Sequence, residues 1–182
     1  VEAGPLVIER RSSPLCAVPP MNYGSMPIDD GHLVLNPAER IEALSESATL
    51  KPYVRRYIGG NEFLNNIERY CFWFVDASPA LIRASKFASE RIRKTREFRL
   101  SSDREATQAL AGTPQLFGEI RQPKGRYLVV PKVSSENRPI MPIGFEPERV
   151  IASGSALLVP QASIFHFAVL TSAMHMAWMR AV

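Results

Sequence analysis

The stretch TPQLFGEIRQPKGRYLVVPKVSSENRPIMPIGF, residues 113–145, alternates basic, apolar and turn residues at the spacing of a β-strand. In an extended backbone, successive side chains point to opposite faces. One face then carries Arg126, Leu128, Val130, Lys132, Ser134, Glu136 and Arg138, and the other carries Tyr127, Val129, Val133 and Asn137. Gly125 precedes the strand and Pro131 lacks a donor for the hydrogen-bond ladder, which predicts an edge strand with an exposed tip.

The composition around this stretch is that of one globular domain. The chain has 182 residues, 46% apolar and 22% charged, and its 15 prolines indicate many loops. A net charge of +4 favours an anionic partner such as nucleic acid, but many proteins without such a partner are equally basic. Cys16 and Cys71 are too few and too far apart for a zinc cluster or a disulfide framework. They predict two inert thiols in a reducing cytoplasm.

The two ends of the chain differ in character. Prolines make residues 1–35 an irregular connecting arm, with at most a short strand at Leu6–Glu9, and leave residues 36–182 as the domain. The turn residues of Asp29–His32 favour a tight turn over a metal site. Residues 162–182 form an apolar helical run of the length of a membrane span, but polar residues interrupt it, so a buried packing helix is favoured.

That terminal run also predicts that the chain is a piece of a larger protein. It ends while still fully apolar, and the chain opens with neither an initiator methionine nor a signal pattern. Its two histidines, His166 and His175, fall on different helix faces, which favours packing roles over a paired ligand set.

The elements between the ends predict a mixed α/β domain of the α+β class, with a small, partly antiparallel sheet. Asn36, Pro37 and Glu39 open a helix to about Ser47, and residues 70–75 form a strand buried on both faces. A long basic helix starts at Ser78 and Pro79, and a second, short helix starts at Ser102 or Asp103 and ends near Ala111. Short strands at 149–152 and 155–159 flank Ser153–Gly154 as a tight hairpin or bulge, and the terminal helix covers the sheet.

Positive charge is concentrated in one part of the chain. Residues 81–126 hold eleven of the 22 Lys and Arg residues but only five Asp and Glu residues. Two interpretations stand: a solvated helix face, or a surface that follows DNA phosphates. Arg55 and Arg56, ahead of the Gly59–Gly60 turn, are open to the same two interpretations.

Motifs for catalysis are missing from the sequence. There is no Gly-x-Ser-x-Gly elbow, phosphate loop, Gly-x-Gly-x-x-Gly cofactor turn or His-Glu-x-x-His metal helix. We therefore assign no catalytic residue, no metal ligand and no cofactor to these residues.

Five segments, taken in order, span nearly the whole chain: 11–35, 57–74, 96–107, 116–145 and 152–182. Together they resemble the target-recognition domain of Mme-type restriction-modification enzymes, a family of single-chain type II proteins. This resemblance implies a reader of double-stranded DNA joined to an adenine-specific methyltransferase domain in the same parent chain. S-adenosylmethionine would then bind to that domain, whose Asn-Pro-Pro-Tyr motif does not occur in this sequence.

The resemblance also implies site residues. Base readers of the family lie where this sequence has Ser134, Glu136 and Arg138, and, in a second set, Ser102 and Arg104. Glutamate accepts from the cytosine amino group and arginine donates twice to guanine, so Glu136 and Arg138 together suit one C·G pair. The alternative is a surface ion pair. Residues suited to the DNA backbone are Arg121, Lys124, Arg126, Lys132, Arg55 and Arg56.

Two other functions compete with sequence-specific DNA reading. A non-specific DNA- or RNA-binding module would need the rings of Phe72, Trp73, Phe74 and Tyr127 exposed for stacking, although their apolar neighbours predict burial. A small-molecule enzyme acting on an anionic substrate would need a catalytic constellation. No helix is expected to span a membrane, and a cytoplasmic protein is expected.

Overall fold

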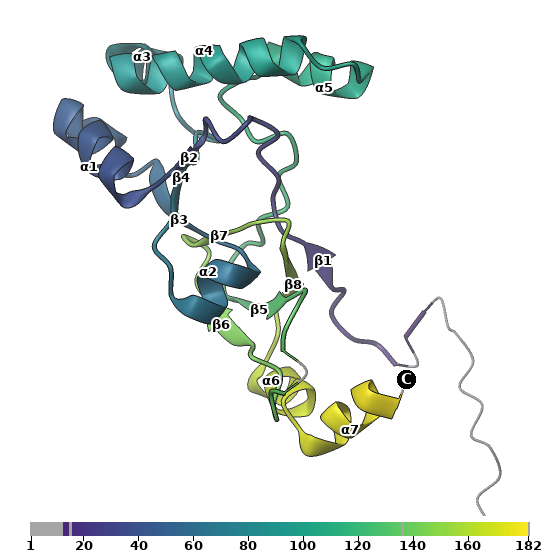
Figure 1. The fold of residues 1–182 in the computed structure, drawn as a ribbon. Coiled ribbons are helices and arrows are strands. Elements are labelled where there is room, and N and C mark those ends of the chain that lie inside the picture. Colours follow the sequence, from purple (N-terminus) through teal and green to yellow (C-terminus); the bar gives the residue numbers. More distant parts are fainter. Residues whose placement is uncertain (1–12, 15, 136, 182) are drawn as a thin grey trace, which may run out of the picture.

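The computed structural model describes residues 13–14, 16–135 and 137–181, which form two four-stranded sheets and the helices around them (Figure 1). The first sheet has the order β1 (Asn22–Tyr23), β8 (Ala156–Pro160), β5 (Tyr127–Pro131), β6 (Gly144–Glu146). The second has the order β2 (Val34–Leu35), β4 (Tyr70–Phe72), β3 (Val54–Ile58), β7 (Ile151–Ala152). Among the strand pairs of these two sheets, β3–β7 is parallel and the others are antiparallel. The α+β class is confirmed, with two small sheets where one was expected.

Strand β5 confirms the predicted alternation of faces. Tyr127 and Val129 join the apolar cluster that contains Ile58, while Leu128 and Val130 join the cluster on the other face of the sheet. The predicted edge position is wrong, because β5 pairs with β8 on one side and with β6 on the other. Pro131 is tolerated since it is the last residue of the strand.

The predicted extension of this strand to residue 138 is also wrong. The strand ends at Pro131, and the backbone N–H of Arg138 donates to the Ser135 carbonyl at 3.1 Å in a turn. Position 136, and with it the pairing of Glu136 and Arg138, lies outside the described residues. Strand geometry therefore gives no support for placing those two side chains together.

The aromatic run at residues 70–75 lies in the core, as predicted. Phe72 and Phe74 stack with ring centroids 4.9 Å apart, and Trp73 packs edge-on against Phe117 at 5.1 Å. Tyr127 is fully buried as well, so none of these rings offers a face to a nucleic-acid base. Burial also raises the pKa of the Cys71 thiol, which agrees with an inert cysteine.

Helix α1 (Pro37–Glu46) has the cap that the sequence predicts. The Asn36 side chain accepts from the Glu39 backbone N–H, and the Glu39 carboxylate accepts from the Asn36 backbone N–H, which makes a complete capping box. A 3₁₀ turn, η1 (Ala48–Leu50), follows α1, and the short helix α2 (Gly60–Asn65) follows β3.

The predicted long basic helix is two helices, α3 (Pro79–Ala84) and α4 (Lys86–Leu100). Ser85 breaks the run because its extended backbone caps α4, and its hydroxyl accepts from the Ala88 N–H. The short helix α5 (Glu105–Ala109) begins after Arg104, later than Ser102 or Asp103, and continues into the 3₁₀ turn η2 (Leu110–Gly112).

The predicted C-terminal helix is likewise divided, into α6 (Ile164–Leu170) and α7 (Ala173–Ala181). Neither contains a buried residue, so the expectation of a buried packing helix is wrong for most of its length. Of the two helices, α6 packs against the first sheet: its Phe167 and Leu170 contact the face that carries Leu128 and Val130. Within the described part of the chain, no helix combines the length and the apolar character needed to cross a membrane.

The predicted hairpin around Ser153–Gly154 is wrong, because its two strands enter different sheets. β7 pairs with β3, whereas β8 pairs with β5 and β1. Gly24 packs against the chain between β7 and β8, where any Cβ would collide with the Ser153 carbonyl. The segment 153–155, between β7 and β8, therefore joins the two sheets.

Part of the predicted connecting arm at residues 1–35 belongs to this core. Residues 22–35 supply β1 and β2, and Leu33 and Leu35 are fully buried. Asp29 to His32 form the predicted turn, in which the Asp29 carboxylate accepts from the backbone N–H groups of Gly31 and Leu33. The possible strand at Leu6–Glu9 lies outside the described residues.

Candidate nucleic-acid interface

Much of the positive charge of α4 is used inside the domain. Arg99 is fully buried, and its guanidinium donates to five backbone carbonyls, those of Pro27, Ile28, Leu110, Thr113 and Leu116, at 2.7–3.1 Å. Burial lowers the pKa of Arg99, although a guanidinium stays charged in proteins. This arginine is a structural connection between α4 and two loops.

Other basic residues of α4 are neutralised or turned inward. Arg91 donates to the carbonyls of Gly31, His32 and Val34 and pairs with Glu39 at 2.8 Å. Arg93 forms ion pairs with Glu90 and Glu97, one turn away on each side, and Lys94 approaches Glu90 at 3.8 Å. The structure thus favours the interpretation of α4 as a structural and solvated helix over a surface that follows phosphates.

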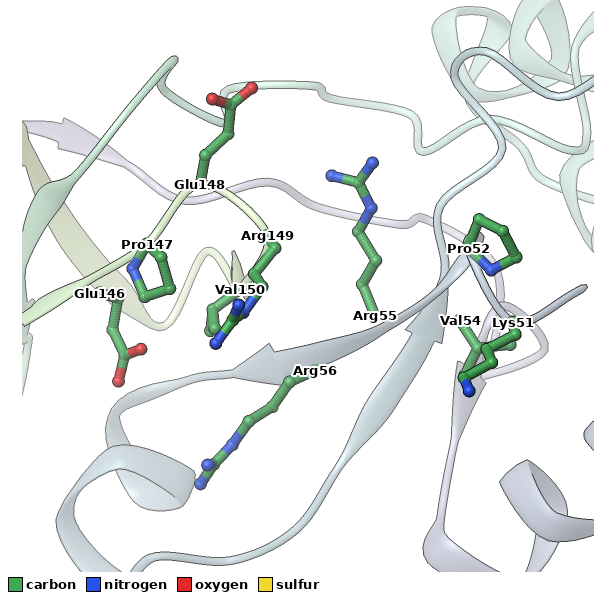
Figure 2. Close-up of a pocket in the computed structure, with 10 residues that line it drawn as sticks. All are labelled: Lys51, Pro52, Val54, Arg55, Arg56, Glu146, Pro147, Glu148, Arg149 and Val150. Carbon is green, nitrogen blue, oxygen red and sulfur yellow. The ribbon is translucent and has the colours of Figure 1, made fainter.

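A second group of basic residues gathers around an open hollow of about 680 Å³ (Figure 2). Arg55 and Arg56 reach it from β3, and two residues that the sequence interpretation missed, Lys51 and Arg149, line it as well. Lys51, Arg55 and Arg56 are close in sequence, but Arg149 is about 90 residues away along the chain. The turn that carries Arg149 leads into β7, and the parallel pairing of β7 with the end of β3 brings this turn to the hollow.

Two carboxylates share the hollow with these cations. Glu146 is half-buried, and its pKa is raised by burial, against the lowering effect of the nearby Arg56 and Arg149. Glu148 accepts from the backbone N–H of Gly125 at 2.9 Å, which connects the hollow to the loop before β5.

That loop, residues 121–126, adds two of the predicted phosphate residues to the same end of β5. Gln122 holds the loop in place by donating to the carbonyls of Glu148 and Val150. Lys124 is exposed, and Arg126 lies over the Phe145 ring at 4.1 Å. Arg121 forms an ion pair with Glu119, so its charge is partly neutralised.

The predicted reader loop lies at the other end of β5. Lys132 lies over the Tyr23 ring at 4.2 Å, and Ser134 is exposed. Arg138 is half-buried, and its carbonyl accepts from the Arg180 guanidinium at 3.2 Å, which attaches the loop to α7. Lys132 is therefore separated by the length of the strand from Lys124 and Arg126.

The second predicted reader set lies elsewhere again. Ser102 and Arg104 occupy the connection between α4 and α5, where the Ser102 hydroxyl accepts from the Arg104 N–H at 3.2 Å. Arg104 is exposed. Figure 1 shows α4 and α5 at one end of the molecule and α6 at the other. Helix α6 packs beside the predicted reader loop between β5 and β6. The structure does not bring the two sets together.

Comparison with known proteins gives matches along almost the whole chain. The family described as MmeI, target recognition domain, matches residues 2–182. The DNA methyltransferase A of Bacillus subtilis (strain 168) is 33% identical over 177 residues, which is 97% of this chain and 20% of that protein. A solved structure of the type IIL restriction-modification enzyme MmeI in complex with DNA superposes with a TM-score of 0.89 at 39% identity.

That superposition covers 97% of this chain and 24% of the MmeI chain. The chain thus spans about a fifth to a quarter of the length of these relatives. Because the family matches all but the first residue, and both relatives align with nearly the whole domain, the chain belongs to the MmeI target recognition domain family.

Proposed function

We propose that this domain reads a specific sequence of double-stranded DNA and directs adenine methylation by a methyltransferase domain of the same parent chain. The observation that carries the proposal is the full-length match to a target recognition domain, including the fold of a relative solved with DNA. The parent protein would act in the cytoplasm, and S-adenosylmethionine would bind to the methyltransferase domain.

The loop between β5 and β6 has suitable chemistry for base readout. Arg138 can donate two hydrogen bonds to O6 and N7 of guanine in the major groove, and Ser134 can contact several bases. Glu136, proposed from the sequence alone, would accept from the amino group of the paired cytosine. The link between Arg138 and Arg180 limits the freedom of the loop, which lowers the entropic cost of binding.

The second reader set would contact the DNA at another point. Arg104 is exposed at the start of α5, with Ser102 beside it, so it can reach a base edge or a phosphate. Arg55, Arg56, Lys124, Arg126 and Lys132 are proposed to contact phosphates, and Arg121 to do so less strongly because of its pairing with Glu119.

The direct test is selection from a random duplex pool by the full-length parent protein with S-adenosylmethionine. Bound duplexes should converge on one sequence that contains a methylated adenine. A single-stranded or RNA pool of the same composition, used as the control, should give no common sequence. Equal recovery of all duplexes, or better binding to RNA, would contradict the proposal.

A further inference from the structure

We propose that Lys51, Arg55, Arg56 and Arg149 form one phosphate-binding hollow that holds a stretch of DNA backbone away from the base-reading loops. The inference rests on the proposed function and deepens it. It adds Lys51 and Arg149 to the interface, and it replaces the basic face of α4 by the hollow as the principal phosphate contact.

The first argument is the arrangement of like charges. Arg55 and Arg56 lie on β3, Lys51 precedes this strand, and Arg149 lies in the turn before β7, and all four line one hollow. Like charges that line one hollow repel each other unless an anion lies between them. A phosphate group supplies that anion and accepts several hydrogen bonds from guanidinium groups.

The second argument is the contrast with α4. Among the residues that the structure describes, Lys51, Arg55, Arg56 and Arg149 form no ion pair with a carboxylate. Arg91, Arg93 and Lys94 of α4 each have a carboxylate partner. Lys86 and Arg96 of α4 also form no ion pair among the described residues, so α4 keeps two unpaired cations, whereas four gather at the hollow.

The third argument concerns the two acids in the hollow. Glu148 is occupied by the Gly125 N–H, and burial favours the neutral form of Glu146. Four cations therefore face at most two negative charges, and the hollow is electropositive. In Figure 2 the guanidinium groups of Arg149 and Arg56 lie on the side of Glu146, and the Arg55 side chain points upward from β3.

The lining also indicates which part of a nucleic acid fits. Six of its ten residues are charged, two are proline and two are valine, so no aromatic ring is available for a base to stack on. The hollow is open to solvent, as an extended backbone requires. A phosphodiester backbone therefore fits this lining better than a nucleoside.

The test is the salt dependence of duplex binding by the full-length protein, with the duplex obtained by site selection. Arg149→Gln and Lys51→Gln, alone and combined, should each reduce the slope of log affinity against log salt by about 0.9 for each phosphate that the variant no longer neutralises. Base preference should stay unchanged, because interactions with the DNA backbone carry no direct sequence information. The thermal unfolding midpoint of each variant shows whether it has folded.

The matched controls are Arg93→Gln and Lys94→Gln on α4, which should leave the slope unchanged. A wild-type protein with no preferred duplex would contradict the proposed function itself. Normal site preference with an unchanged slope in folded hollow variants would overturn the hollow alone. Tight binding of inorganic phosphate that the variants lose, with an unchanged DNA slope, would assign the hollow to a small anion instead and would also overturn the inference.

Discussion

Arg99 has the largest fully buried side chain in the described part of the domain. Its guanidinium donates the hydrogen bonds that water would otherwise donate to five backbone carbonyls. Replacing it by methionine fills a similar volume but leaves those carbonyls without a donor. We expect Arg99→Met to lower the free energy of unfolding by about 3–5 kcal/mol. Arg99→Lys should also be strongly destabilising, because one ammonium has only three donors.

Chemical denaturation of the wild type and of these variants measures this loss. The control is Arg96→Met, at an exposed position of the same helix, which should change the stability by no more than about 0.5 kcal/mol. Similar stabilities for the Arg99 and Arg96 variants would show that water satisfies the five carbonyls when the arginine is absent.

Arg138 is expected to affect which sequence is bound. If it donates to a guanine, Arg138→Ala should weaken binding to the preferred duplex by about 1–3 kcal/mol and relax the preference at one base position. Lys132→Ala should weaken binding to all duplexes about equally, because a phosphate contact is independent of sequence. Site selection with both variants makes the comparison, and an unchanged base preference in Arg138→Ala would move the readout elsewhere.

Among the elements, α1 and α4 are joined by a carboxylate at a helix start. Glu46, the last residue of α1, accepts from the Ser85 hydroxyl at 2.6 Å and from the Phe87 backbone N–H at 3.0 Å. The hydrogen bond from Ser85 holds the pKa of Glu46 below its ordinary value. A negative charge is also stabilising at the N-terminus of α4.

We expect Glu46→Gln to destabilise the domain by about 0.5–1 kcal/mol at neutral pH, since the group is exposed and screened by solvent. A lowered pKa in the folded state gives stability that is present above the unfolded pKa and lost as the pH falls through the folded value. The difference between wild type and variant should therefore begin to shrink as the pH falls below the unfolded pKa of about 4.3, and it should vanish once the pH is below the lowered pKa of the folded state. Unfolding measured against pH checks this, with Asp103→Asn as the control, and a difference that persists in acid would exclude the charge as its cause.

Elements were predictable from the sequence where their causes are local. The cap of α1 depends on Asn36 and Glu39, three residues apart, and the alternation in β5 depends on the period of a strand. The break at Ser85 was missed although its cap to the Ala88 N–H is local, because serine also occurs inside helices and the contact with Glu46 that holds this cap comes from 39 residues away. The hairpin at Ser153–Gly154 was wrong for the same kind of reason, since the contacts that direct β7 and β8 into different sheets come from β3, β1 and β5.

The candidate site shows the same limit. Lys124 and Arg126 lie in the stretch that the sequence singled out, and each is exposed as expected. Arg149 was missed because its link to Arg55 depends on the turn before β7, the strand that pairs with the end of β3, and Lys51 was missed although it lies only four residues before Arg55. The strongest charge signal came from the seven basic residues between positions 83 and 99. In the structure, however, Arg91 and Arg99 donate to backbone carbonyls of the domain, and Arg93 forms ion pairs with neighbouring glutamates of α4. The density of charge in a sequence therefore does not distinguish structural arginines and surface ion pairs from residues that are free to bind phosphate.

At the scale of the whole molecule, the two reader sets lie at opposite ends, one between α4 and α5 and the other beside α6 and α7 (Figure 1). Side chains that are far apart and share no partner act additively on binding free energy, usually within about 0.5 kcal/mol. Arg104→Ala and Arg138→Ala should therefore add in the double variant, and each should relax the preference at a different position of the recognition sequence. Site selection and affinity measurements on the wild type, both single variants and the double variant complete the cycle. A coupling clearly above about 0.5 kcal/mol, or relaxation at the same base pair, would mean that both arginines contact one point of the duplex, which this arrangement of the two ends does not allow.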